Sequence, residues 1–135
     1  MQEPVGDVYA HTIAVEANDI DELGHVNNIV YVRWVQEAAA AHWNYLADEE
    51  TKRENAWVVV RHEIDYLSPA LISDDVVAKT WVGESGGAKS VRYVDVCSAT
   101  GKIFAKAKTT WCLLSAQNMR PKRIDEKMLA VLFKK

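Results

Sequence analysis

Cysteine is scarce in this sequence, with two residues among 135. The spacings typical of structural zinc sites, CxxC and CxxH, are absent, so the sequence indicates no zinc module. Cys97 and Cys112 fall on strands predicted below, and a turn at Thr100–Gly101 would pair Cys97 with a residue near Phe104. Cys112 would then lie several residues away along the hairpin, beyond the reach of a disulfide. We therefore expect two free thiols, as is usual in a reducing compartment.

Long apolar runs are also absent. None approaches the roughly 20 residues needed to span a bilayer. The N-terminal MQEPVGDVYA has neither the basic start nor the apolar core of a secretory signal. The formal net charge is −3, with acids and bases mixed along the chain, which gives no electrostatic basis for binding nucleic acid or an anionic membrane. We expect a cytoplasmic protein whose partners are neither nucleic acid nor membrane.

Proline is rare, and it marks loops. The three prolines, at positions 4, 69 and 121, stand where other signals also indicate loops. No Pro/Gly-rich linker, internal repeat or low-complexity tract occurs. A chain of this length that is 49% hydrophobic suits one domain with its own core. We expect a single domain over residues 1–135.

One segment has the pattern of a long amphipathic helix. From Asn28 to about Leu46 there is no proline or glycine, and apolar residues recur at spacings of three and four, as one buried helix face requires. That face comprises Ile29, Val30, Trp34, Val35, Ala38, Ala39, His42, Trp43 and Leu46. Asn27 or Asn28 can cap the helix, because an asparagine side chain accepts hydrogen bonds from N–H groups of the first turn.

Alternation of apolar and polar residues predicts strands in the rest of the chain. They are expected at residues 8–16, 56–67, 74–84, 89–99 and 102–115. The segment GESGGAK would form a turn and the polar DEETKREN a connection. In the strand at 56–67, one face is expected to carry Val58, Val60, His62, Ile64 and Tyr66, with His62 as a core histidine.

A short C-terminal helix behind Pro121 would turn apolar residues inward. These are Met128, Leu129, Leu132 and Phe133. The order of elements is then one strand, a long buried helix and four antiparallel strands. One sheet that covers one helix is an α+β architecture.

The segment Asp19–Asn28, DIDELGHVNN, is too polar for a core. Taken alone it is typical of a turn, because Asp, Asn and Gly bond to the local backbone and tolerate unusual backbone angles. It also leads directly into the predicted helix. The first N–H groups of a helix lack partners and carry roughly half a positive charge, so they favour an anion at that point.

The pattern Asp-x-x-x-His-Val-Asn-Asn-x-x-Tyr resembles the signature of hotdog-fold acyl thioesterases of the 4-hydroxybenzoyl-CoA thioesterase type. It is formed here by Asp21, His25, Val26, Asn27, Asn28 and Tyr31. It is close to the pattern of bacterial long-chain acyl-CoA thioesterases and of plant acyl-carrier-protein thioesterases. The later segments WVVVRHEIDYLSPALISDDV and TTWCLLS resemble strands of the same family. The resemblance implies a hotdog fold, in which an antiparallel five-stranded sheet wraps around one long central helix.

The resemblance also implies site residues. Asp21 matches the family's catalytic carboxylate, His25 its histidine, and Asn28 the position whose backbone N–H contacts the oxyanion, while Tyr31 is expected to contact substrate. The plant enzymes carry a further Asn where this chain has Leu23, so their full set of residues is not implied. The implied reaction is hydrolysis of acyl-CoA or acyl carrier protein without a metal or other cofactor. Asp21 would act as nucleophile or as general base, and both roles stay open.

Coenzyme A and the arm of a carrier protein both carry phosphate, which Arg and Lys usually bind. Candidates are Lys89 and Arg92, with Arg120, Lys122 and Arg123 as a second cluster. The acyl group needs an apolar slot, expected between the long helix and a second subunit. An unpaired edge strand such as 56–67 would be an aggregation hazard, which also favours a homodimer or homotetramer.

Three alternatives stay open. A dehydratase or hydratase of the same fold would place a histidine and an acid beside a thioester to move protons. A non-catalytic acyl-binding module would bind without turnover, since a fold does not fix a function. A metal site at Asp21 and His25 would need a third ligand, which the sequence does not place nearby.

Overall fold

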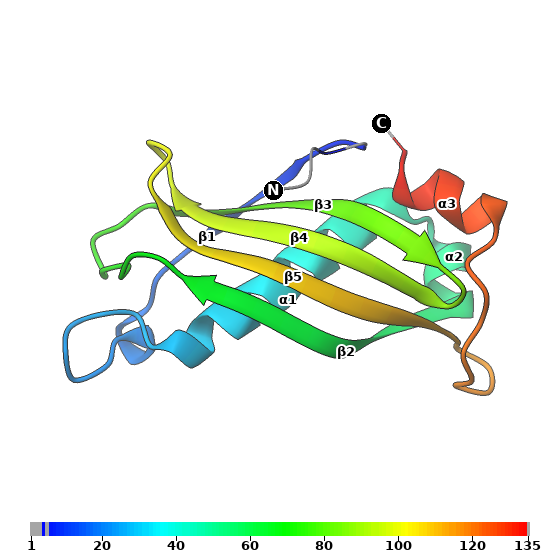
Figure 1. The fold of residues 1–135 in the computed structure, drawn as a ribbon, viewed down its shortest axis with the longest axis horizontal. Coiled ribbons are helices and arrows are strands. Elements are labelled where there is room, and N and C mark those ends of the chain that lie inside the picture. The colour runs from blue at the N-terminus through cyan, green and yellow to red at the C-terminus, as the bar shows by residue number, and fades with distance from the viewer. Residues whose placement is uncertain (1–3, 5, 135) are drawn as a thin grey trace.

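A five-stranded antiparallel sheet lies across one long helix (Figure 1). The computed structural model describes residue 4 and residues 6–134. The strands are β1 (Tyr9–Ile13), β2 (Asn55–Tyr66), β3 (Val76–Gly86), β4 (Lys89–Ser98) and β5 (Ile103–Ser115). The helices are α1 (Asn28–Leu46), α2 (Glu49–Glu54) and α3 (Glu126–Leu132), with a 3-10 turn η1 (Ala17–Asp19). The predicted α+β architecture is confirmed.

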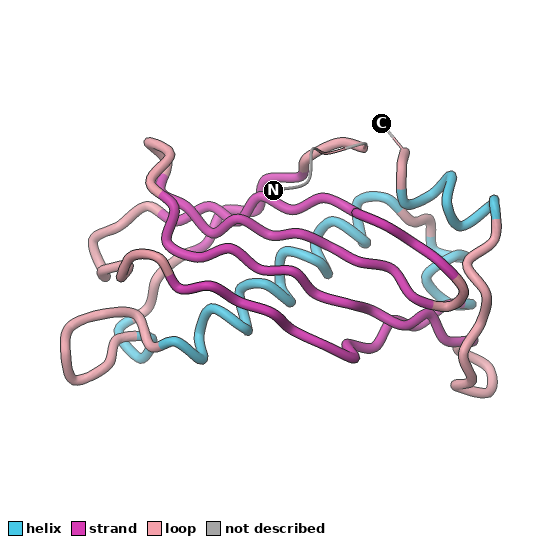
Figure 2. Tube along the Cα trace, viewed as in Figure 1, coloured by secondary structure: helices cyan, strands magenta, loops and turns pink. Residues whose placement is uncertain are grey.

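The strand order β1-β3-β4-β5-β2 explains the position of the helix. The chain leaves β1 at one edge of the sheet and enters β2 at the other, and α1 makes the connection across one face of the sheet (Figure 2). The start of α1 lies at one end of the sheet. Helices α2 and α3 lie at the opposite end (Figure 1).

Alanine side chains on both elements, Ala38 on α1 and Ala105 and Ala107 on β5, allow the helix to lie close to the sheet. The predicted helix bounds are confirmed, and Trp34, Val35 and Ala38 are fully buried on its inner face. They share one core cluster with Ala105 and Ala107 of β5. Each fully buried large side chain contributes about 1.5–3 kcal/mol relative to exposure, so this helix face accounts for much of the stability.

The predicted face of β2 is wrong in its first half. A β-bulge between Val59 and Arg61 shifts the register against β5, and Val58 and Val60 are exposed. Beyond the bulge, His62 pairs with Thr109 on the inner face, as predicted, and their side chains bond at 3.1 Å. The extra residue of a bulge shifts the inward–outward alternation of side chains by one residue. One alternating pattern therefore cannot describe both halves of β2.

Two connections also differ from the predictions. DEETKREN contains α2, because the Asp48 side chain caps it by accepting from the N–H of Thr51, and its acids and bases complement the helix dipole. Strand β3 continues through Gly86, so the turn before β4 is only Gly87–Ala88, where Gly87 has a φ of 61°. The C-terminal helix is confirmed, and Cys97 and Cys112 are buried free thiols, as predicted.

A polar contact joins α1 to the sheet. The Arg92 side chain on β4 donates through Nη1 to His42 Nδ1 of α1 at 2.8 Å and to Thr80 Oγ1 of β3 at 3.0 Å. His42 is 2% exposed and stacks on Tyr9, with 5.1 Å between the ring centroids. Burial, and then the Arg92 charge, lower the pKa of His42 to about 4, so the imidazole is neutral and accepts this bond. Packing was predicted for His42 and is confirmed, but its bond to Arg92 was not foreseen.

This contact predicts a loss of stability in mild acid. An unfolded histidine takes its proton near pH 6.5, whereas the folded pKa of His42 is about 4. Between these values the unfolded state binds more protons, so the free energy of unfolding falls as pH falls from 6.5 towards 4. Over pH 7 to 5, His42 should account for a loss of about 1–2 kcal/mol. In urea unfolding, His42→Gln should remove this component and His11→Gln should not. Equal pH dependence in the wild type and His42→Gln would contradict the assignment.

Candidate active site

The polar segment before α1 is a closed loop. An isolated bridge joins Ile20 to Val26, and the N–H of Asp21 donates to the carbonyl of His25 at 2.7 Å. Gly24 lies at the tip with a φ of 79°, a left-handed conformation that glycine adopts without strain. The N–H of Val26 donates to the carbonyl of Ala70, which fixes the loop to the connection after β2. The segment thus has a defined shape.

Asp19 has a structural role in this loop. It is 3% exposed and accepts from Arg33 Nη2 at 2.9 Å and from the N–H of Glu16 at 2.9 Å. Its own carbonyl accepts from the N–H of Asn27. The salt bridge and the backbone bond satisfy the buried carboxylate, as a buried charge requires.

The two carboxylate oxygens of Asp21 differ in their contacts. Oδ1 accepts from the N–H of Leu23 at 2.9 Å and from that of His25 at 3.1 Å. Oδ2 bonds to none of the described residues, and the side chain is only partly buried. One oxygen therefore holds the carboxylate in place, and the other has no partner among the described residues.

The first turn of α1 presents a free donor beside this carboxylate. Asn27 is the N-cap, and its Oδ1 accepts from the N–H of Ile29 at 3.1 Å, while its carbonyl accepts from the N–H of Val30. The N–H of Asn28 has no acceptor within the described part of the chain. Tyr66, at the end of β2, donates its hydroxyl to the carbonyl of Asn28 at 3.2 Å. The turn is thus fixed to the sheet with one donor open.

A cavity of about 430 Å³ brings these groups together. Its lining comprises Asp21, Leu23, His25, Val26, Asn27, Asn28, Tyr31, Tyr66, Leu67, Ser68 and Pro69. The Asp21 carboxylate and the start of α1 therefore line the same cavity, together with Tyr66 at the end of β2 and the loop that follows it. An anion here would meet the positive end of the helix dipole.

Tyr31 forms part of the wall. It is 2% exposed, and its hydroxyl accepts from the N–H of Ala70 at 3.1 Å. Its ring meets that of Tyr66 edge-on, with 5.5 Å between centroids. Burial raises the pKa of the Tyr31 hydroxyl, so it stays protonated and keeps a donor.

The structure does not bring Lys89 or Arg92 to this cavity in the same chain. Lys89 is exposed at the start of β4, and Arg92 contacts His42, which lies about 21 Å along α1 from Asn28. In the second basic cluster, Lys122 Nζ donates to Asn55 Oδ1 at 2.7 Å near α3. Arg92 lies on the same side of β4 as the buried residues Val94 and Val96. This alternation in the sequence is the pattern from which its inward orientation could have been predicted.

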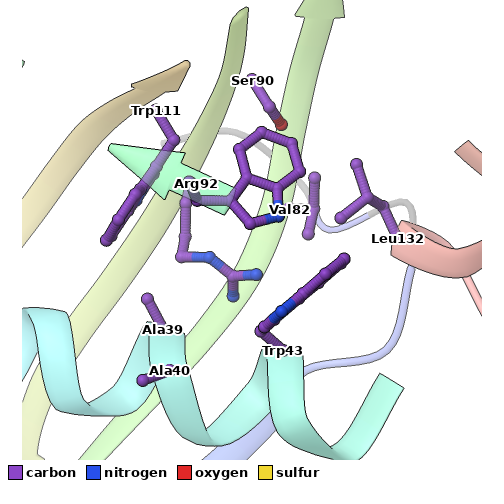
Figure 3. A pocket seen from close by; sticks show the side chains of 9 residues that line it. Ala39, Ala40, Trp43, Val82, Ser90, Arg92, Trp111 and Leu132 are labelled. Atoms are coloured by element: carbon purple, nitrogen blue, oxygen red, sulfur yellow. The ribbon is translucent and has the colours of Figure 1, made fainter. Parts of the chain in front are cut away.

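Arg92 lines a second cavity, of about 200 Å³, between α1 and the sheet (Figure 3). The other lining residues are Ala39, Ala40, Trp43, Trp57, Val82, Ser90, Trp111 and Leu132. No pattern in the sequence predicts this cavity.

No group of three His, Cys, Asp or Glu side chains in residues 4 and 6–134 is placed to bind a metal ion. Asp21 and His25 therefore have no third protein ligand beside them. Within the same residues, no helix combines the length and apolar character of a membrane span.

Solved structures share this architecture. A thioesterase of Thermus thermophilus, complexed with coenzyme A and Zn, is 26% identical, and the match covers 91% of this chain and 90% of that chain, with a TM-score of 0.80. YbaW, a probable thioesterase of Escherichia coli, is 23% identical over 93% and 98% of the two chains, with a TM-score of 0.78. Slr0204, a 1,4-dihydroxy-2-naphthoyl-CoA thioesterase of Synechocystis, is 14% identical over 95% and 97%, with a TM-score of 0.80. The fold is the hotdog fold, as predicted.

Sequence comparison gives the family. No curated protein matches the chain. The model of the thioesterase-like superfamily matches residues 15–132, which include the loop with Asp21, all of α1 and strands β2 to β5. This chain belongs to the thioesterase-like superfamily.

Proposed function

We propose that this protein hydrolyses an acyl-CoA or acyl-carrier-protein thioester to a free carboxylic acid and a thiol. The observation that carries the proposal is the shared cavity of Asp21 and the open N–H at the start of α1. Coenzyme A in the Thermus thermophilus relative supports a CoA ester as substrate.

The N-terminus of α1 is the proposed oxyanion site. Attack on the thioester carbonyl places negative charge on its oxygen, and a fixed donor at that oxygen lowers the barrier by about 3–4 kcal/mol. The N–H of Asn28 is free to donate, and the N-cap and Tyr66 hold its turn in place. Because these contacts exist before substrate binds, little reorganisation is needed during the reaction.

Asp21 acts on the carbonyl carbon by one of two routes. As general base it takes a proton from water, the water oxygen attacks the carbon, the C–S bond breaks, and the departing sulfur receives the proton. As nucleophile its oxygen attacks the carbon and the C–S bond breaks, which releases the thiolate. Water then cleaves the mixed anhydride, which restores the Asp21 carboxylate and releases a proton that converts the thiolate to the thiol. Both routes need an ionised carboxylate with one free oxygen, which matches the unbonded Oδ2.

His25 lies in the same cavity, four residues after Asp21. Its carbonyl accepts from the N–H of Asp21, and its own N–H donates to Asp21 Oδ1. No described residue bonds to its ring, so a ring nitrogen remains to orient a water molecule or the substrate. We assign it a part in positioning the attacking group, and Tyr31 a part in the cavity wall.

Exchange of the carboxylate for an amide tests the role of Asp21. Asp21→Asn keeps an Oδ1 that can accept from Leu23 and His25, so the loop should keep its shape. Removal of the charge should lower kcat at least about 100-fold. Thiol release from a panel of acyl-CoA esters measures the change, and unfolding in urea should show little loss of stability.

Glu22→Gln is the matched control, because Glu22 is the exposed neighbouring carboxylate and does not line the cavity. It should keep activity within about twofold. Wild-type hydrolysis retained by Asp21→Asn would overturn the assignment. Binding of acyl-CoA without turnover by the wild type would favour an acyl-binding module, and hydration of enoyl-CoA would favour a hydratase.

A proline at position 28 tests the oxyanion donor itself. Asn28 is the first residue of α1, where proline is favoured, and the preceding Asn27 has the extended ψ of 137° that proline requires. Asn28→Pro therefore removes the open N–H with little cost to the helix. We expect kcat to fall about 100- to 1,000-fold, while Asn28→Ala, which keeps the N–H, stays within a few-fold. Similar activity in the two variants would sink the oxyanion assignment.

We also propose that the single-domain chain works as a homodimer or homotetramer. One side of β2 pairs with β5, and its other side is the edge of the sheet, with Val58 and Val60 exposed on the strand. A partner strand at this edge would bury it and protect it from aggregation. Light scattering should give about two or four times the chain mass of 15.2 kDa. A single-chain mass at working concentration would contradict this.

A further inference from the structure

The second cavity contains a charged side chain, that of Arg92, which does not line the cavity of Asp21. It lies between α1 and the inner face of the sheet, with a volume of about 200 Å³. Its walls are mostly apolar and include Trp43, Trp57, Val82, Trp111 and Leu132. In Figure 3, the guanidinium of Arg92 reaches from β4 towards Ala39 and Ala40 of α1, between the aromatic side chains.

Arg92 is a buried cation that has no carboxylate partner among the described residues. It is 6% exposed, and its two side-chain bonds both leave Nη1 and reach neutral groups, His42 and Thr80. Nε and Nη2 bond to no described residue, and no Asp or Glu lines the cavity. Burial lowers the pKa of Arg92 only to about 10, so it is charged at pH 7, and neutral His42 does not compensate that charge.

Such an arrangement favours an anion in the cavity. A buried charge without an opposite charge is unfavourable, and an anion that bonds to the free side of the guanidinium relieves this. A carboxylate fits the planar fork with two parallel hydrogen bonds. The single positive charge and apolar walls match a monoanion with an apolar body better than a phosphate dianion.

We propose that this cavity binds a small carboxylic acid anion with a compact aromatic or short aliphatic body. A dry apolar cavity of about 150 Å³ holds benzene, so a volume near 200 Å³ suits one ring or a short chain together with its carboxylate. Ala40 is exposed and lines the cavity, so it marks the opening. Within one chain this cavity shares no lining residue with the cavity of Asp21, and binding there does not require thioester hydrolysis.

Ligand pairs that differ only in charge test the proposal on the intact protein. Benzoate and hexanoate are titrated against benzamide and hexanamide, with inorganic phosphate as a further anion. Calorimetry and the fluorescence of the lining tryptophans report binding. We expect each carboxylate to bind at least about 10-fold more tightly than its amide, because charge-assisted hydrogen bonds are the stronger kind. Equal binding of acid and amide, or tighter binding of phosphate, would overturn the proposal.

Variants locate the site. Arg92→Met should abolish the preference for carboxylate, and Ala40→Leu, which keeps Arg92 and changes an exposed helix position, should weaken binding at least about 10-fold by narrowing the opening. Lys108→Met removes an exposed charge from neighbouring β5 and should leave binding unchanged.

Asp21→Asn should also bind benzoate as the wild type does. Loss of benzoate binding in Asp21→Asn would assign the ligand to the other cavity. Unchanged binding in Ala40→Leu would likewise place the ligand elsewhere, and either result contradicts the proposal. Failure of Arg92→Met to fold does not remove the test, since Ala40→Leu and the acid–amide pairs remain.

Discussion

The candidate site depends on where the first turn of α1 is held. Three contacts fix it: the N-cap bond from Asn27, the Tyr66 hydroxyl on the carbonyl of Asn28, and the bond from Val26 to Ala70. The buried face of the helix prevents it from sliding along the sheet, because Trp34 and Ala38 have no exposed surface. The open N–H at position 28 is therefore a fixed feature of the fold, and the dipole of a 19-residue helix adds to it.

The loop before this turn holds two acids in different environments. Asp19 is buried and paired with Arg33, whereas Asp21 is held by backbone N–H groups through one oxygen only. Of these two acids, only Asp21 keeps a carboxylate oxygen that bonds to none of the described residues. Arg92 differs from Asp19, because no acid in the described part of the chain pairs with its buried charge. The protein keeps unpaired polar groups at two cavities, at opposite ends of one helix.

Sequence predicted the features that depend on local periodicity and capping. The bounds of α1 follow from apolar spacing and from the asparagine before the helix. The site residues Asp21 and Asn28 were implied instead by the resemblance to the hotdog thioesterases. The bulge at Val60 was not predictable, since a bulge interrupts the alternation without a distinctive residue. The short helix α2 could have been predicted from Asp48, whose side chain caps it. The inward position of Arg92 could have been predicted from the alternation of β4, because Arg92 lies on the same side of the strand as the buried Val94.

The most direct test of the central claim is a crystal structure with a non-hydrolysable acyl-CoA analogue. We expect the analogue's carbonyl oxygen to lie about 3 Å from the backbone nitrogen of residue 28, a normal hydrogen-bond distance. The Oδ2 atom of Asp21 should face the carbonyl carbon or its attacking water. A carbonyl bound away from the start of α1, with the Asp21 carboxylate in solvent, would contradict it.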